Sequence, residues 1–575
     1  MKRMNRGQRA GLGAALGLGA AVAAVPAAQA ADYTVTNLSD SGSGSLRAAI
    51  DDTNTNAGDD RILFQSGLSG TIAVAGDLPA LTGPVEIVGP GKDQMKVDGD
   101  QTHALLVSES NLKVSGLTLA NGRYDAGGGN ISVSLADLTV DDSRIEGGFS
   151  QDHGGGGISL VGGALTISNS EISGNVTQSS GGGGVNGYYT TKVAISNSTF
   201  SGNAGAIGGG ARLTLGSDTT IKDSVFENNQ GATGAGLYAT NGSIAVDSTL
   251  FSGNTATTSV GGALVGSLTF AAGGFAQGPY SVTNSTFTGN KADRGGAFMT
   301  VGGAKVQSST ITGNQSTGSD GSSFLRGAGM IAAFGQVTLD NSIVSGNTPK
   351  DITTTEPATN PVPVPGGSVL GSFNLVGNIF NTNITESVPG SNISSTDPGL
   401  GPLADNGGPT MTMMPADSSP VVNKGSSPLA VDQRGLTRPV DFNSIPFSSA
   451  PGANGADIGA VELQGGPLSP PSNEFSFGKV KLNRKKGVAT LQVKVPGAGE
   501  VALAGTKAVK GSKKSSKAAS TIGLTVKAKG KAAKTLKKKG KVKVKASVKF
   551  TPTGGTAKAR SKTVKLVKKK KKKRK

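Results

Sequence analysis

The chain of 575 residues has no cysteine and no tryptophan, and only 4% of its residues are aromatic. The absence of cysteine excludes disulfides, thiolate metal sites and cysteine nucleophiles. With no Trp and only 6 Tyr, the sequence offers little for stacking a sugar or a nucleic-acid base on an aromatic platform. A composition this poor in aromatic residues suits a narrow core of Ile, Val, Leu and Ala.

One short phrase recurs seven times in the middle of the chain. It consists of an aliphatic residue, two small polar residues, Ser or Thr, any residue, Phe/Ile/Val, two small residues and Asn. The copies are Ile167–Asn175, Ile195–Asn203, Ile221–Asn229, Val246–Asn254, Val282–Asn290, Val306–Asn314 and Leu339–Asn347, and a degenerate copy runs from Val140 to Gly148. The closing asparagines are 28, 26, 25, 36, 24 and 33 residues apart. Irregular repeats of this length are typical of a solenoid.

The phrase also predicts which solenoid forms. Apolar and β-branched residues alternate with Ser, Thr and Asn, as in strands with one buried face. Gly and Asn bound the strands and tolerate the sharp corners of a coil. We therefore expect an all-β, right-handed parallel β-helix in which one corner of successive coils stacks its asparagine side chains. This corner comprises Asn175, Asn203, Asn229, Asn254, Asn290, Asn314 and Asn347.

A second element lies between the phrases: Gly155–Ile158, Gly182–Val185, Gly261–Leu264 and Gly295–Phe298 each read Gly-Gly-[Ala/Gly]-aliphatic or Phe. Four phrases end in a literal Phe-x-x-Asn. Over residues 120 to 347 this alternation resembles the repeats of bacterial polymorphic outer-membrane proteins, which implies an exported, pectin-lyase-like surface β-helix. We assign residues 119–348 to these repeats.

Residues 1–30 read as a signal peptide. Lys2, Arg3, Arg6 and Arg9 precede an apolar run from Ala10 to Val25, and Ala28-Gln29-Ala30 is a small-x-small cleavage site. The run is shorter than the roughly 20 residues that span a bilayer. We expect a mature chain that begins near Ala31, carries no transmembrane segment and is secreted or held at the bacterial cell surface.

The block after the signal, Tyr33–Leu38 with Ser43–Ile50 and Arg61–Phe64, is similar to the CSLREA domain of secreted β-helix proteins, with Gly44 and Ala48 at the positions of that motif's Cys and Glu. Ser43 or Ser45 can cap a short helix whose apolar stripe covers the open end of the coil. Residues 31–118 are thus predicted to form an N-terminal cap and the first coils.

After a Pro/Thr-rich linker or loop at 349–365, four motifs follow in order: Asp397–Thr410, Ser419–Asn423, Asp432–Gly435 with Arg438-Pro439, and Ala456–Glu462. On these motifs, residues 366–463 resemble the choice-of-anchor domain that closes bacterial surface β-helices. Met413 and Met414 stand where that pattern commonly has His. Asp432, Arg434, Arg438 and Asp457 form either a catalytic cluster or, as we favour, an ion-pair network that fixes long loops at the end of the coil.

Charge divides the chain in two. Residues 474–575 hold 34 Lys and Arg against 2 acidic residues; subtracting these from the totals of 56 and 38 leaves 22 basic and 36 acidic residues before them. After a linker at 464–473, alternating apolar residues in 474–567 predict about six strands of a Lys-covered, immunoglobulin-like sandwich. Lys510 to Ser520 and the tail 568–575 read as disordered. The tail residues Lys568, Lys569, Lys570, Lys571, Lys572, Lys573, Arg574 and Lys575 are candidates for binding a polyanion.

These features favour a monomeric structural or adhesin-like surface protein. Its expected partners are anionic cell-envelope polymers or acidic polysaccharides rather than nucleic acid, and no cofactor is required. The alternative is a polysaccharide lyase or glycoside hydrolase, since such enzymes use this fold with charged residues on adjacent coils. Asp152, His153, Asp293 and Arg294 would then be the catalytic candidates. Calcium at Asp59-Asp60 or Asp141-Asp142 stays open, although the regular calcium-binding repeat is missing.

Overall fold

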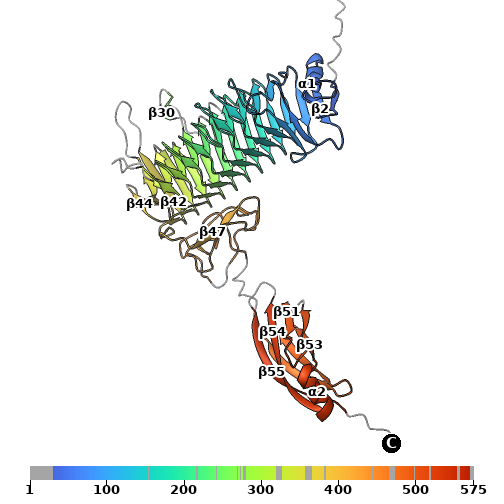
Figure 1. The fold of residues 1–575 in the computed structure, drawn as a ribbon. Helices are drawn as coiled ribbons and strands as arrows, with labels where there is room; N and C mark the ends of the chain where they lie inside the picture. Colours follow the sequence, from blue (N-terminus) through green and yellow to red (C-terminus); the bar gives the residue numbers. More distant parts are fainter. Residues whose placement is uncertain are drawn as a thin grey trace, which may run out of the picture. The chain divides into compact units, whose positions relative to one another are not determined.

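The computed structural model describes residues 30–569 except 153, 215–217, 241, 259, 268–269, 272–273, 276–279, 319–326, 334, 356–365, 381–383, 442–444, 465–472, 498, 517–519 and 553–556. The chain forms two compact units, residues 1–464 and 465–575. The first is a stack of coils with a helix at its N-terminal end, and the second is a small β-domain (Figure 1). The expected signal peptide, residues 1–30, lies outside the described residues except for Ala30.

Three parallel sheets of 14, 13 and 11 strands run along the first unit, and from β6 onward the coils contribute strands to all three. The first sheet contains β1 (Asp32–Val35), β2 (Asp60–Phe64), β4 (Val85–Val88), β7 (Leu112–Ser115), β10 (Leu138–Asp141), β14 (Ala164–Ser168), β18 (Lys192–Ser196), β21 (Asp218–Lys222), β25 (Ile244–Asp247), β31 (Tyr280–Thr283), β35 (Ala304–Gln307), β39 (Gly335–Asp340), β42 (Gly367–Ser372) and β45 (Ile384–Glu386). The second contains β3 (Gly70–Ala73), β5 (Met95–Asp98), β8 (Thr118–Ala120), β11 (Arg144–Glu146), β15 (Glu171–Ser173), β19 (Thr199–Ser201), β22 (Val225–Glu227), β26 (Leu250–Ser252), β32 (Thr286–Thr288), β36 (Thr310–Thr312), β40 (Ile343–Val344), β43 (Leu375–Val376) and β46 (Ile393–Ser394).

The third sheet contains β6 (Leu106–Ser108), β9 (Ile131–Ser134), β13 (Ile158–Val161), β17 (Val185–Tyr188), β20 (Ala211–Thr214), β24 (Leu237–Thr240), β28 (Leu264–Ser267), β34 (Phe298–Val301), β38 (Gly327–Ala333), β41 (Lys350–Thr354) and β44 (Ile379–Phe380). Short parallel pairings lie between the second and third sheets: β12 (Phe149–Ser150) with β16 (Val176–Thr177), and β23 (Gln230–Gly231), β27 (Thr255–Ala256), β33 (Lys291–Ala292) and β37 (Gln315–Ser316). An antiparallel hairpin, β29 (Phe270–Ala271) and β30 (Gly274–Phe275), projects from one coil.

Each repeated phrase builds one strand, a corner and the next strand. In one coil, Ile195 points into the core from β18, and Asn197 turns the chain with a positive φ of 47°. Ser198 then accepts the backbone N–H of Ser170 on the preceding coil at 3.2 Å, and Phe200 points inward from β19. Because Asn adopts positive φ at low cost, the polar positions of the phrase are corner residues.

The core consists of like residues stacked on like residues. Phe200, Phe226, Phe251 and Phe287 are fully buried, and successive ring centroids are 4.6, 4.9 and 4.8 Å apart with the rings within 12° of parallel. This separation equals the spacing between hydrogen-bonded strands. The backbone pairing therefore sets the geometry of the aromatic stack.

The Gly-Gly elements precede the strands of the third sheet, where the backbone lies close both to the following residues of its own coil and to a neighbouring coil. A Cβ on Gly155 would lie 1.9 Å from the Ile158 oxygen, and one on Gly156 would lie 2.4 Å from the Val176 nitrogen. Gly182 repeats the contact of Gly155, with its Cβ 1.9 Å from the Val185 oxygen. Only glycine fits at these positions, which explains the second repeated element.

The seven corner asparagines form a buried, directional row of hydrogen bonds. The backbone N and the Nδ2 of each asparagine both donate to the Oδ1 of the next, at 2.8–3.1 Å. Each Nδ2 also donates to a backbone oxygen of the preceding coil, for example Asn229 to Phe200 at 2.9 Å. Asn130 occupies the place left by Gly148, because its Nδ2 donates to the Oδ1 of Asn175 at 3.3 Å.

Asp351 ends this row. Its Oδ1 accepts both the N and the Nδ2 of Asn347 at 2.8 Å, and its Oδ2 accepts the backbone N of Asn378 at 2.6 Å. The carboxyl group is 1% exposed, and burial raises its pKa above the ordinary range. Each asparagine thus donates to the next one along the coil axis, and the last, Asn347, donates to a carboxyl group whose two oxygens both accept.

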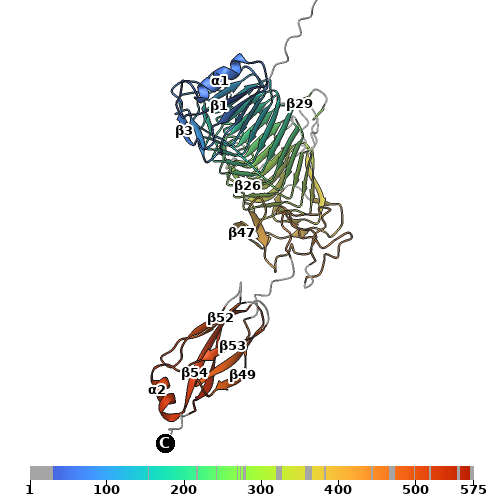
Figure 2. The same ribbon diagram turned by 90° about the vertical axis from the view of Figure 1, so that its right-hand side faces the viewer.

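Helix α1 (Leu46–Thr55) packs on β1 and β2 at the start of the stack (Figure 2). Ser45 is its N-cap and accepts the backbone N–H of Ala48 at 3.2 Å. Leu46, Ala49 and Ile50 are buried in the coil's core cluster. The helix therefore covers the edge at which pairing between coils would otherwise begin.

The coils continue further than the expected boundaries. The segment 349–365, expected as a linker or loop, begins with β41 of the third sheet, and its residues 356–365 lie outside the described part of the chain. Strands β42 to β46 extend the coil to Ser394, inside the segment assigned to the closing domain. At the corner between the first and second sheets, Asn374 takes the place of the serine of earlier coils, since its Oδ1 accepts the backbone N of Ser342 at 2.9 Å.

Residues 398–463 form mostly loops with one antiparallel hairpin, β47 (Leu400–Ala404) and β48 (Thr412–Pro415). This closing segment lies beside the coils, below the green and yellow strands in Figure 1. It contacts successive corners: Thr410 donates to the Ser248 oxygen at 3.3 Å, and Ser427 lies 2.9 Å from Ser308. It therefore packs along the side of the rod, where the sequence suggested a position at its end.

The second unit is a sandwich of a three-stranded and a four-stranded antiparallel sheet. The sheets contain β49 (Ser476–Asn483), β50 (Val488–Val495) and β53 (Ser520–Val526), and β51 (Gly499–Leu503), β52 (Ser512–Ser516), β54 (Lys541–Pro552) and β55 (Lys558–Val567). Helix α2 (Gly530–Lys539) ends at Gly540, whose φ is 72°. Leu491, Leu524, Val548 and Phe550 are fully buried between the sheets.

The predicted fold class is confirmed: an all-β, parallel β-helix with a short N-terminal helix and a small Lys-rich β-sandwich. The sandwich differs from the expectation in two places. Helix α2 was missed, because its lysines read as a charge run and only Leu536 is buried. The disorder expected from Lys510 to Ser520 is also wrong at Ser512–Ser516, because backbone pairing with β51 makes these residues the strand β52.

Replacing one member of the asparagine row should destabilise the rod. In Asn229→Ala, the N and Nδ2 of Asn203 lose their acceptor and the Phe200 oxygen loses its donor, all of them buried. We expect a loss of about 3 kcal/mol or more in the free energy of unfolding, since each unsatisfied buried group costs about 1–3 kcal/mol. The urea-unfolding midpoint of residues 31–464 measures this. Gln230→Ala, which removes the neighbouring exposed amide, is the control, and equal losses in both variants would contradict the role of the row.

Candidate functional site

The candidate catalytic residues do not form one site. The corner pairings step from Phe149 to Val176, Ala204, Gln230, Thr255 and Lys291, so the loop of Asp152 lies five coils from that of Asp293. At a strand spacing of about 4.8 Å, the two loops are about 24 Å apart. Acid–base catalysis requires both groups within hydrogen-bond reach of one substrate bond. His153 lies outside the described residues.

Asp293 and Arg294 pair with each other instead. The Nε of Arg294 lies 3.5 Å from the Oδ2 of Asp293, and both side chains are about one-third exposed. The backbone oxygen of Asp293 accepts the hydroxyl of Ser316 at 2.7 Å and the backbone N of Gly318 at 2.9 Å. These contacts describe a loop held by the next coil, and Asp152 is an exposed loop residue.

A hollow on the outer face of the third sheet is lined by Arg212, a partly buried cation. It has a volume of about 440 Å³, and its lining includes Ser159, Asn186, Tyr188 and Arg212. The Nη1 of Arg212 donates to the Oδ1 of Asn186 at 3.1 Å, and its guanidinium lies 5.8 Å from the centre of the Tyr188 ring. Its Nε is buried without a hydrogen-bond partner.

No carboxylate among the described residues forms an ion pair with Arg212, and burial lowers the pKa of its guanidinium. A partly buried, uncompensated cation carries a desolvation cost that an anionic ligand offsets. The planar guanidinium matches a carboxylate with two parallel hydrogen bonds. Sequence reasoning missed this residue because Arg212 occurs once and repeats no motif; its only signal was a charged residue at an alternating position of a strand.

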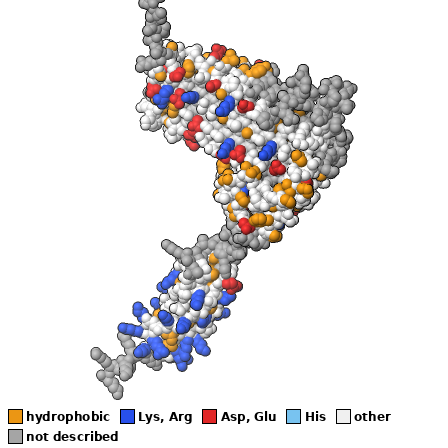
Figure 3. Space-filling model, turned by 180° about the vertical axis from the view of Figure 1, so that it is seen from behind, with side chains coloured by type: hydrophobic (Ala, Val, Ile, Leu, Met, Phe, Trp, Pro, Cys, Tyr) orange, Lys and Arg blue, Asp and Glu red, His pale blue; other side chains and the backbone are white. Residues whose placement is uncertain are grey.

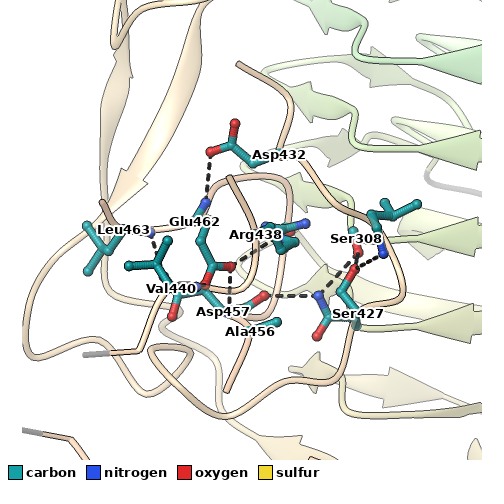
Figure 4. A network of polar contacts seen from close by, with 12 residues as sticks. Ser308, Ser427, Asp432, Arg438, Val440, Ala456, Asp457, Glu462 and Leu463 are labelled. Atoms are coloured by element: carbon teal, nitrogen blue, oxygen red, sulfur yellow. Dashed lines mark hydrogen bonds and ion pairs between the residues drawn. The ribbon is translucent and has the colours of Figure 1, made fainter. Parts of the chain in front are cut away.

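The closing segment is fixed by buried ion pairs. Arg434 donates through its Nη2 to the Oδ2 of Asp432 at 2.7 Å, and Arg438 donates through its Nε to the Oε2 of Glu462 at 3.0 Å. All four side chains are at most 3% exposed. Figure 4 shows Asp432 accepting the backbone N of Glu462 and Arg438 reaching the carboxylate of Glu462.

The same network joins the closing segment to the rod. Arg438 donates to the Oδ1 of Asn284 at 3.3 Å, and Gln433 accepts the hydroxyl of Thr286 at 2.6 Å. Asn341 donates to the Asp457 oxygen at 2.9 Å. Because Asp432, Arg434, Arg438 and Glu462 are buried and paired, the described residues of the closing segment form an ion-pair network.

Asp457 is the most perturbed carboxyl group of this network. Burial, with a further contribution from nearby Glu462, raises the pKa of Asp457 to about 7. Its two oxygens accept the backbone N–H groups of Asn423 at 2.8 Å and Leu463 at 2.7 Å. Burial likewise raises the pKa of Glu462, and the charge of Arg438 partly opposes that shift.

The second unit has a row of lysines along β54. Along this strand, exposed lysines alternate with apolar residues that are buried or half-buried. The exposed lysines are Lys541, Lys543, Lys545 and Lys549. Lys543 lies directly opposite Lys565 of β55. Like charges that face each other across two strands destabilise a sheet. Figure 3 shows Lys and Arg gathered over the face of this unit that it presents.

Acidic residues do not neutralise this row. Residues 474–575 hold only two: Glu474, which pairs with Lys558 and Arg560, and Glu500, which pairs with Lys513. Among the described residues, the β54 lysines and Lys565 therefore have no carboxylate partner. Of the predicted polyanion-binding tail, Lys568 and Lys569 are described and exposed, and residues 570–575 lie outside the described part.

The described residues show no group of three His, Asp or Glu side chains that could hold a metal ion. Asp141, one of the calcium candidates, instead accepts the hydroxyl of Ser168 at 2.6 Å and the Nδ2 of Asn169 at 2.8 Å. Asp142 lies 3.3 Å from the Nζ of Lys92. In the part of the chain that is described, no helix is long and apolar enough to cross a bilayer.

Comparison with known proteins identifies the fold and little else. A family model described as a right-handed β-helix region matches residues 102–272, and no curated protein matches the chain. A solved structure described as the PL6 family alginate lyase AlyGC is 15% identical over 72% of this chain and 60% of that chain, with a TM-score of 0.37. A mannuronic acid specific polysaccharide family 6 lyase from human gut microbiota is 12% identical over 62% of this chain and 82% of that one, with a TM-score of 0.32. At these values neither likeness bears on activity.

The stability of the closing segment should depend on pH through Asp457. Because its pKa is raised to about 7, the folded state holds a proton that the unfolded state releases above about pH 4. Stability should therefore fall as pH rises from 4 to 7, by at most about 1.4 kcal/mol per pH unit. Urea-unfolding midpoints of residues 31–464 across this range measure the slope.

Asp457→Asn should flatten that slope, whatever its effect on absolute stability, because the side chain no longer titrates. Asp417→Asn is the matched control, since Asp417 is an exposed carboxylate of the same segment. An unchanged slope in Asp457→Asn would show that other groups carry the dependence.

Proposed function

We propose that this protein is a secreted, cell-surface-associated β-helix protein of structural or adhesin-like function, held to anionic envelope polymers by its Lys-rich second unit. The observation that carries the proposal is the β54 row, in which Lys541, Lys543, Lys545 and Lys549 share one side of a strand and Lys543 faces Lys565. Such an arrangement costs folding energy, and binding of a polyanion offsets that cost by neutralising the repulsion and releasing counterions.

The rod suits the displaying part of such a protein. Its core is continuous from Val35 to Val376, and its buried asparagine row leaves loops and outer sheet faces free to vary. The residues before 474 carry 22 basic and 36 acidic residues, so an anionic polymer would be attracted to the second unit and repelled by the rod. Electrostatic attachment of this kind needs no covalent anchor.

Co-sedimentation of the mature chain with isolated cell envelopes tests the proposal. We expect the chain to pellet at low salt and to be released at high salt, whereas a chain ending at Gln464 stays in the supernatant. Equal pelleting of both chains would assign binding to the rod or its closing segment and would contradict the proposal.

A charge-matched comparison separates a specific lysine surface from net charge. Replacing Lys541, Lys543, Lys545 and Lys549 with Gln should weaken binding and reduce the slope of log affinity against log salt by about 3, if all four contact anionic groups. Replacing the exposed rod residues Lys113, Lys192, Lys222 and Lys305 with Gln changes the net charge equally. Equal effects of the two sets would show that net charge alone governs attachment.

A second candidate function is that of a polysaccharide lyase or glycoside hydrolase, favoured by the hollow around Arg212. A guanidinium there would neutralise the carboxylate of an acidic sugar, and the phenol of Tyr188 lies in the same lining. Proton abstraction next to a neutralised carboxylate is the chemistry of an eliminating enzyme.

Release of unsaturated or reducing ends from a panel of acidic glycans tests this second function. Arg212→Gln and Tyr188→Phe should abolish any release, whereas Asp293→Ala and Arg294→Ala, three coils away from the Ala204 coil, should leave it unchanged. The absence of release from the whole panel would leave the rod without this activity.

A further inference from the structure

A buried carboxylate at the N-terminal end of the rod has no cation beside it. Asp60, the first residue of β2, is 2% exposed. Its Oδ1 accepts the Nδ2 of Asn56 at 2.7 Å and the backbone N of Ala31 at 2.9 Å, whereas its Oδ2 is buried without a hydrogen-bond partner. A buried charge without a counter-charge is strongly destabilising.

The neighbouring basic residue does not compensate Asp60. Arg61 points to other carboxylates: its Nη1 lies 3.6 Å from Asp32 and its Nε lies 3.4 Å from Glu86. No ion pair among the described residues involves Asp60. The backbone N of Ala31 is one of the two donors to Asp60. The backbone oxygen of Ala31 in turn accepts the backbone N of Arg61 at 2.8 Å, which holds Ala31 beside the carboxylate.

Ala31 is also the residue that the expected cleavage would place at the start of the chain. The motif Ala28-Gln29-Ala30 directly precedes it. Ala30 is exposed and lines an open hollow of about 640 Å³ together with Asn54, Asn56 and Thr82. The nitrogen of the bond that would be cleaved therefore already contacts the uncompensated carboxylate of Asp60.

We propose that hydrolysis of the Ala30–Ala31 bond creates the counter-ion of Asp60, so that removal of the signal completes the cap of the β-helix. A signal-peptidase-type protease adds water across this bond; Ala30 leaves with the new carboxylate, and Ala31 keeps the nitrogen, which takes up a proton to become an α-ammonium. The amide of the uncleaved chain has one N–H and no charge. The ammonium has three N–H groups and a positive charge, and so can satisfy Oδ2 as well as Oδ1.

This inference rests on the export that the proposed function assumes and adds a consequence for stability. The coil begins at β1, which immediately follows Ala31 and pairs with β2 in register from Asp32 to Val35. Stabilising Asp60 therefore stabilises the first pairing between coils. A chain that keeps its signal would have a weaker cap than one that has lost it.

Native-state hydrogen exchange of the segment 31–64 in two forms of the full-length mature protein tests the inference. One form begins at Ala31, and the other keeps Ala30 as one additional residue. We expect opening of this segment to be about tenfold or more rarer in the first form, because breaking a buried ion pair is costly. Equal exchange in both forms would overturn the proposal.

Two carboxylate variants identify the partner of the amine. Asp60→Asn should abolish the difference between the two forms, whereas Asp59→Asn, the exposed neighbouring carboxylate, should preserve it. Because the comparison within each variant is between two N-termini, a general loss of stability in Asp60→Asn does not obscure the result. A difference that survives in Asp60→Asn would overturn the assignment.

The pH dependence gives an independent readout. An α-amino group has an ordinary pKa of about 7.7–8.0, and pairing with a carboxylate raises it, so the extra protection should be present below about pH 8 and disappear at higher pH. The other charged or titratable groups near this site are Tyr33, Asp52, Asp59 and Arg61, and Tyr33 has a pKa raised above its ordinary value by burial and by Asp60 and Asp52. The form that begins at Ala30 and the Asp60→Asn variant should lack this loss of protection.

N-terminal sequencing of the exported protein completes the test. A start at Ala31 is expected, and a start at any other residue overturns the inference. Failure of the Lys-rich unit to bind envelopes would affect only the proposed attachment, because neither the N-terminal sequence nor exchange in residues 31–64 depends on that unit.

Discussion

Parallel pairing of each coil with the next is the constraint on which the rest of the first unit depends. It fixes the distance between equivalent residues at about 4.8 Å, so every side chain must tolerate a copy of itself, or a near relative, directly above and below. Phenylalanine rings satisfy this by stacking, and asparagine amides satisfy it by donating to one neighbour and accepting from the other. Charged side chains do not, which is why the buried ion pairs of the described rod lie in the aperiodic closing segment and the buried carboxyl groups Asp60 and Asp351 each occur only once in the coils.

What could be predicted from the sequence follows the same division. The β-helix, the asparagine row and the helix cap were accessible, because a repeat displays its structural requirements many times or, as at Ser45, because a capping residue precedes an apolar stripe. Features that occur once were not: Asp351 at the end of the row, Arg212 in its hollow, and the lateral packing of the closing segment on Asn284 and Ser308. The prediction that Asp152 and Asp293 belong to one site is wrong, because their loops are separated by five coils.

The two units show opposite solutions to charge. In the closing segment of the rod, Asp432, Arg434, Arg438 and Glu462 are buried and paired, and their charges are used to join irregular loops to regular coils. In the second unit, the lysines of β54 and Lys565 are exposed, have no carboxylate partner among the described residues, and at Lys543 and Lys565 face one another across neighbouring strands. A small sandwich core with fully buried Leu491, Leu524 and Phe550 supports this surface. The first arrangement stabilises a structure, and the second gives up stability for an interaction with something outside the chain.

The asparagine row has a direction: from Asn175 to Asn314, each Nδ2 donates to the Oδ1 of the asparagine on the next coil, and only the terminal groups, Asn130 and Asp351, differ from the rest. Every middle coil therefore offers an asparagine Oδ1 as acceptor to the coil before it, and an asparagine N and Nδ2 as donors to the coil after it. Gene duplication or loss of whole coils would leave both terminal groups in place and every internal bond intact. The length of the rod is thus free to change in evolution in steps of one coil, while the two ends stay fixed.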